Sequence, residues 1–169
     1  MKKLCLLGLF VTLASQSVLA DNLPTPIENK NAFISNLMKQ MTLEEKIGQL
    51  RLISIGPEMP REMIRKEIAA GNIGGTFNSI TRDENRPMQD AAMRSRLKIP
   101  MFFAYDVIHG HRTIFPIPLA LASSWDMDAI YRSGRVAAQE AAADSLDITF
   151  APMVDISRDP RWGRTSEGF

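Results

Sequence analysis

Cysteine is almost absent from this chain, and so are long apolar runs and any excess of charge of one sign. The only cysteine among the 169 residues is Cys5, so the rest of the chain has no thiol for a disulfide and has to fold by burying apolar side chains. The formal net charge of +1 gives no support for a nucleic acid or a membrane surface as a partner. A hydrophobic content of 45% indicates a globular chain rather than a disordered one.

The first 20 residues have the pattern of a secretory signal peptide. Lys2 and Lys3 precede a short apolar stretch at 4–14, and residues 18–20 (VLA) resemble a cleavage site of small residues. The apolar stretch is shorter than the roughly 20 residues that a membrane-spanning helix needs. We therefore expect residues 1–20 to be a signal peptide, cleaved before Asp21, that directs the protein to the periplasm without a membrane anchor.

After this segment, helical and extended patterns alternate. Residues 21–40 are expected to form a lead-in and a first helix, and residues 41–169 a larger domain. Thr42 and Glu45 have the spacing of a capping box, which marks the start of a helix. In the larger domain, helices are expected at 43–50, 61–70, 87–97 and 128–145, and strands at 52–55, 73–77, 99–105 and 148–154.

This alternation is typical of an α/β fold in which helical crossovers connect parallel strands. The strands are apolar on both faces, as strands buried under helices are. About 150 residues remain after the expected signal peptide, which is fewer than the roughly 250 of a closed (β/α)8 barrel.

Two charged loops follow the last two expected strands. Asp106 comes directly after one strand, and Arg164 lies in the loop after the next. Because the carboxyl ends of parallel strands lie at one edge and consecutive strands are usually neighbours, we expect these side chains to meet at one rim. A carboxylate accepts hydroxyl protons and a guanidinium donates from a rigid fork, so the pair suits a neutral polyol.

Structural roles for the same residues are an alternative. Asp106 can cap the turn that follows it, and the arginines can hold their own loop together. The residues concerned in such ion pairs are Arg158 and Arg164 with Asp155, Asp159 or Glu167. His109 and His111 are two positions apart without an evident third ligand, so we expect no metal site.

Four motifs, in this order along the chain, resemble glycoside hydrolase family 3. They are MTLEEKIGQL at 41–50, AYDVIHG at 104–110, FPIP at 115–118 and RDPRWGR at 158–164. The resemblance implies a (β/α)8 TIM-type barrel, of which residues 41–169 are the truncated N-terminal portion, about half. Such a half barrel has two open sheet edges.

The resemblance also implies an activity, namely hydrolysis of terminal non-reducing β-D-glucosyl residues of glucosides and oligosaccharides with retention, without a cofactor. In this family the aspartate of the YDxxHG motif and the second arginine of RWGR bind the sugar in the cleavage subsite, and these roles carry over to Asp106 and Arg164. Glu167 is the lesser candidate, as a partner for the arginine.

The nucleophile and the acid/base of the family correspond to no residue of this sequence, so no catalytic residue is assigned. We expect an N-terminal fragment that needs the C-terminal part of its own chain and is inactive alone. Two alternatives stay open. One is a β-N-acetylglucosaminidase of the same family, and the other is a non-catalytic periplasmic module that binds sugar.

Overall fold

The computed structural model describes residues 29–168, so the expected signal peptide at 1–20 and most of the expected lead-in lie outside the described residues. The chain divides into two compact units, 1–37 and 38–169. Helix α1 (Lys30–Gln40) begins after Asn29, whose side chain accepts a hydrogen bond from the amide of Ala32. None of the residues of α1 is buried, although its sequence carries the expected apolar positions.

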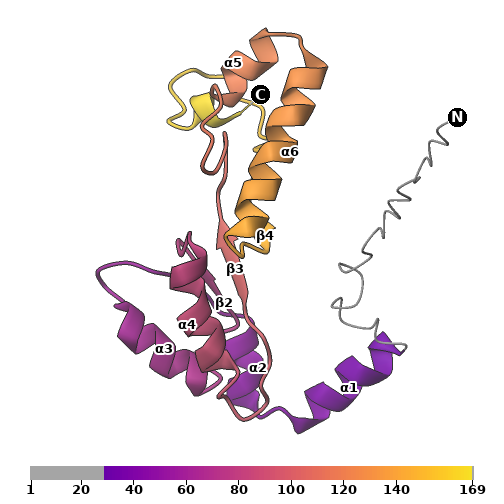
Figure 1. The fold of residues 1–169 in the computed structure, drawn as a ribbon, viewed down its shortest axis with the longest axis vertical. Helices are drawn as coiled ribbons and strands as arrows, with labels where there is room; N and C mark the ends of the chain where they lie inside the picture. The colour runs from indigo at the N-terminus through magenta and orange to yellow at the C-terminus, as the bar shows by residue number, and fades with distance from the viewer. Residues whose placement is uncertain (1–28, 169) are drawn as a thin grey trace, which may run out of the picture. The chain divides into compact units, whose positions relative to one another are not determined.

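The larger unit is built on a parallel sheet of four strands in sequence order (Figure 1). The strands are β1 (Leu52–Ser54), β2 (Gly75–Phe77), β3 (Phe102–Tyr105) and β4 (Ile148–Thr149). Each neighbouring pair is parallel, and each strand is joined to the next through at least one helix. The predicted α/β fold with helical crossovers is therefore confirmed.

The helices of this unit follow the expected order, with two additions, at 118–123 and 165–167. Thr42 caps the first of them through the predicted capping box: its hydroxyl accepts from the amide of Glu45, and the Glu45 carboxylate accepts from the amide of Thr42. Figure 1 shows α3 and α4 side by side on the sheet. The helices are α2 (Leu43–Gln49), α3 (Arg61–Ala69), α4 (Arg82–Ala92), α5 (Pro118–Ser123), α6 (Met127–Ala143) and the 3-10 helix η1 (Thr165–Glu167).

Only one face of the sheet is covered by helices. Ile53, Thr76 and Phe103 are in register on that face, and Phe103 belongs to a buried cluster with side chains from α3, α4 and α6. On the opposite face, a Cβ on Gly75 would lie 2.6 Å from the ring of Phe102, so a larger residue there would require that ring to move. The strands thus carry mainly apolar side chains on both faces, as predicted, and burial is not confined to the helix side, since Ala104 on the opposite face is also fully buried.

Several element boundaries differ from the sequence prediction, and β2 and β3 begin two and three residues later than expected. The helix expected at 87–97 is α4, which begins and ends five residues earlier. It begins at Arg82 because the Thr81 hydroxyl accepts from the amide of Glu84 and so caps it, and it ends at Ala92. The strand expected at 148–154 ends at Thr149, and Pro152 has no amide proton to extend the ladder. Helix α5, which was not predicted, begins with Pro118 at its first position.

Candidate functional site

Asp106 directly follows β3 at the carboxyl edge of the sheet. Its carbonyl oxygen accepts hydrogen bonds from the amide of Ala151 (3.1 Å) and from the hydroxyl of Thr149 (2.9 Å), both in the β4 segment. Tyr105 packs against the helix-side core, and alternation along the strand assigns Asp106 to the opposite face. The half-buried Asp106 side chain is therefore placed on the helix-free face of the sheet, at its rim.

Arg164 and Glu167 lie together in the loop after β4. The Nε and Nη2 atoms of Arg164 donate to Oε2 of Glu167 at 2.9 and 2.6 Å, across the short helix η1. The Arg164 side chain is 58% exposed, so part of its fork remains accessible to a ligand. Glu167 is thus a partner that orients the arginine, as expected from the sequence.

Electrostatics connect this loop with the end of β3. The hydrogen bond to Glu167 is the main cause that raises the pKa of Arg164, and the carboxylates of Asp106 and Asp155 add to the increase. Arg164 in turn lowers the pKa of Glu167. Within residues 29–168 no hydrogen bond joins Asp106 to Arg164. The charges of Asp106 and Arg164 therefore act on each other without a direct hydrogen bond between the two side chains.

The other arginines of this loop differ from Arg164. Arg161 pairs with Asp159 two residues away, and both are exposed. Arg158 makes no ion pair within the described part of the chain. Arg164 differs from both, because it is held by Glu167 and is influenced by the charge of Asp106.

An apolar pocket of about 550 Å³ lies next to this rim, between α6 and the loops after β3 and β4. Small side chains of α6, among them Ala137 and Ala141, form one wall. Asp155 contributes to the lining, whereas Asp106, Arg164 and Glu167 do not. A lining this poor in hydrogen-bonding groups suits apolar contacts and not the hydroxyls of a sugar, so the polar rim is the better candidate site.

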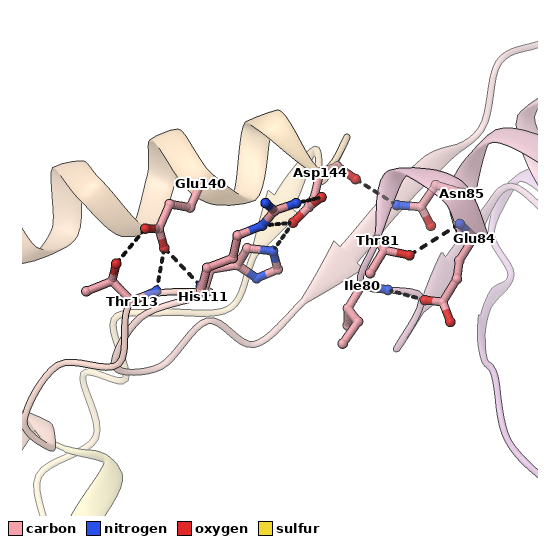
Figure 2. Close-up of polar contacts among 9 residues, drawn as sticks. Ile80, Thr81, Glu84, Asn85, His111, Thr113, Glu140 and Asp144 are labelled. Carbon is pink, nitrogen blue, oxygen red and sulfur yellow. Dashed lines mark hydrogen bonds and ion pairs between the residues drawn. The ribbon is translucent and has the colours of Figure 1, made fainter.

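The loop after β3 is anchored on α6 by a group of ion pairs and hydrogen bonds that the sequence analysis missed (Figure 2). Asp144, the C-cap of α6, accepts from Nε2 of His111 at 2.7 Å and from Nε and Nη2 of Arg112 at 2.8 and 2.5 Å. Glu140, one turn earlier, accepts from the amides of Arg112 and Thr113 and from the Thr113 hydroxyl. We call these five residues the loop anchor.

The loop anchor leaves a recognisable trace in the sequence. Glu140 and Asp144 are four positions apart and therefore lie on one face of α6, and three polar residues, His111 to Thr113, are consecutive in the loop. The spacing of the histidines raised only the question of a metal site. In the structure His109 contacts the carbonyl oxygen of Phe115 through Nδ1, and the described residues contain no group of three potential metal-ligating side chains.

The buried carboxylate of Asp144 makes the stability of the anchor dependent on pH. Hydrogen bonds, first from Arg112 and then from His111, lower its pKa from 3.8 to about 2. A carboxyl whose pKa is lower in the folded state stabilises the fold above its unfolded pKa, and this contribution is lost as the pH falls toward the folded value. It amounts to about 2 kcal/mol at neutral pH.

We therefore expect Asp144→Asn to lower the melting temperature at pH 7, and the difference from the wild type to shrink between about pH 4 and pH 2. Thermal unfolding at a series of pH values measures this. A difference that stays constant from pH 7 to pH 2 would show that the carboxylate charge of Asp144 does not stabilise the fold.

Comparison with known proteins agrees with the resemblance found in the sequence motifs. Residues 42–169 match the glycosyl hydrolase family 3 N terminal domain. Over its whole length the chain is 59% identical to a periplasmic beta-glucosidase of Salmonella typhimurium, of which it covers 23%. The chain thus spans about a quarter of the length of this curated relative. Among the described helices, none is long and apolar enough to cross a membrane.

Solved structures support the fold. An exo-1,3/1,4-beta-glucanase from a Pseudoalteromonas species is similar with a TM-score of 0.68 and 33% identity, over 81% of this chain and 19% of that one. A family 3 beta-N-acetylglucosaminidase from a Paenibacillus species has a TM-score of 0.55 at 22% identity, over 66% of this chain and 24% of that one. At that identity the second likeness concerns the fold alone. The predicted α/β fold, the N-terminal part of a TIM-type barrel, is confirmed.

Proposed function

This chain belongs to glycosyl hydrolase family 3, and from that membership we propose that it is the N-terminal part of a longer retaining β-glucosidase, which we call the complete enzyme. The observation that carries the proposal is the 59% identity with a periplasmic beta-glucosidase along the whole chain. The proposed substrates are glucosides and oligosaccharides with a terminal non-reducing β-D-glucosyl residue. Hydrolysis of such a bond by two carboxyl groups needs no cofactor.

In this proposal the rim holds the glucosyl ring without acting on its bond. Asp106 accepts protons from sugar hydroxyls, and Arg164 donates from the part of its fork that Glu167 leaves available. Charge-assisted hydrogen bonds of this kind are stronger and shorter than neutral ones, so they can fix the orientation of a polyol. The nucleophile and the acid/base belong to parts of the complete enzyme outside these 169 residues, so we expect the isolated chain to give no turnover.

The proposed location is the periplasm, reached by cleavage of a signal peptide at residues 1–20. Support comes from the charged and apolar pattern of these residues and from the name of the Salmonella relative. The absence of cysteine after Cys5 is compatible with folding in that compartment, because no disulfide has to form.

Kinetics on chromogenic substrates test the proposed function. We expect the complete enzyme to hydrolyse an aryl β-D-glucoside much faster than the matching β-N-acetylglucosaminide, and to release β-glucose first in a proton NMR time course, as retention requires. Faster hydrolysis of the acetylated substrate would favour the β-N-acetylglucosaminidase alternative. Binding of glucose without cleavage of either substrate would favour the sugar-binding module.

A further inference from the structure

We infer that Asp144 is a positioning residue for Asp106, acting through the loop that joins Asp106 to His111 and Arg112. The inference rests on the proposed function, because it takes Asp106 as a sugar-binding group. It adds to that function a residue at the end of α6, Asp144, that does not touch the substrate. Loss of Asp144 misplaces Asp106, which does touch it.

The first observation is backbone strain beside Asp106. Val107, the next residue, has a φ of 51°, a left-handed conformation that a β-branched residue adopts only at a cost. Such a conformation persists where the surrounding structure enforces it, and it is concentrated at functional sites. The side chain of Val107 is 6% exposed and belongs to the core cluster with Phe103 and Ala137, so core packing is one of the enforcing contacts.

The second observation is the tight path of the loop from Val107 to the anchor. Gly110 has a φ of 118°, and a Cβ at this position would lie 1.9 Å from the carbonyl oxygen of Thr113. The amide of Phe115 donates to the carbonyl of His109 at 2.8 Å and closes the turn. The turn is so compact that its two arms move together. A displacement of residues 111–113, which are held by the loop anchor, is therefore transmitted to the arm that begins at Asp106.

The third observation is that one helix–strand unit holds both ends of the loop. Thr149 and Ala151, after α6, fix the carbonyl of Asp106, while Asp144 holds His111 and Arg112 from the end of the same helix. The side chains of His111 and Asp144 are only 5% and 4% exposed, so this pair is shielded from competing water. The side-chain amide of Asn85 on α4 donates to the backbone carbonyl of Asp144 at 3.2 Å and fixes the loop anchor against the neighbouring helix (Figure 2).

A double-mutant cycle in the complete enzyme separates positioning from general stability. We expect Asp144→Asn to lower kcat/KM for an aryl β-glucoside by about 10- to 100-fold at a temperature where the variant is folded, as a misplaced binding group does. In an Asp106→Asn background the same change should cost less than about twofold, because the group that Asp144 positions is already lost. If the two substitutions lower kcat/KM independently, so that their fold-losses multiply in the double variant, the inference is overturned.

Two further variants complete the test. Glu45→Gln also removes a carboxylate that accepts from an arginine fork, that of Arg96, but far from the loop, so it should lower the melting temperature and leave kcat/KM unchanged. If Asp144→Asn does not fold, Arg112→Lys replaces it, since lysine keeps the charge but not the two-pronged contact with Asp144. An Arg112→Lys effect that persists in the Asp106→Asn background would equally overturn the inference.

The same cycle distinguishes this inference from the proposed function. If Asp106→Asn alone leaves kcat/KM unchanged, the proposed role of Asp106 fails and the inference fails with it. If Asp106→Asn lowers kcat/KM but Asp144→Asn does not, the proposed role stands and only the positioning role of Asp144 is overturned.

Discussion

Replacing Asp106 by asparagine in the complete enzyme should lower kcat/KM for a β-glucoside by roughly 100- to 1,000-fold. Asparagine has nearly the same shape but no charge, so two charge-assisted hydrogen bonds to the sugar become neutral or are lost, at about 1.5–2 kcal/mol each. The fold should be unaffected, because the contacts of Asp106 with Thr149 and Ala151 use its carbonyl oxygen and not its side chain.

Steady-state kinetics with an aryl glucoside measure this effect, and a melting curve verifies that the variant is folded. Asp90→Asn is the matched control, since Asp90 is a solvent-exposed aspartate on α4 and should tolerate the change without loss of activity. Unchanged kcat/KM in Asp106→Asn would remove this residue from the site.

Replacing Arg164 by lysine should lower kcat/KM by about 10- to 100-fold, because lysine keeps the positive charge but cannot bind Glu167 through Nε and Nη2 while presenting donors to a sugar. The same loop provides a close control. Arg161 is also in an ion pair, with Asp159, but its side chain is 89% exposed and it belongs to no proposed contact.

The comparison of Arg164→Lys with Arg161→Lys therefore distinguishes a ligand-binding arginine from one that only holds the loop. Kinetics of both variants under the same conditions provide the measurement. Equal effects of the two substitutions would mean that the loop needs its ion pairs for structure and that Arg164 has no separate role.

Much of the fold could be predicted because local signals and global topology agree. The capping box of Thr42 and Glu45, readable from their spacing in the sequence, sets the start of α2. The misplaced start of α4 has a definite cause. The sequence prediction begins this helix at Pro87, whereas the side chain of Thr81 caps the helix and Pro87 lies inside it. The Thr81 hydroxyl is therefore a better indicator of where α4 begins than Pro87 is.

The site could be predicted in part. Asp106 and Arg164 are 58 positions apart in the sequence, and the rule that neighbouring parallel strands share a carboxyl edge was enough to expect them at one rim, where the charge of Asp106 acts on Arg164. The loop anchor could not be predicted in this way. It depends on how the loop after β3 folds back onto α6, and no periodicity of the sequence encodes that return.

The most direct test of the account is a crystal structure of the complete enzyme with glucose, or a glucoside that it cannot cleave, in the cleavage subsite. We expect the Asp106 carboxylate and the Arg164 guanidinium to contact hydroxyls of the same glucosyl ring at hydrogen-bonding distance, about 2.6–3.0 Å. A sugar bound in that subsite without contact to either side chain would contradict the account.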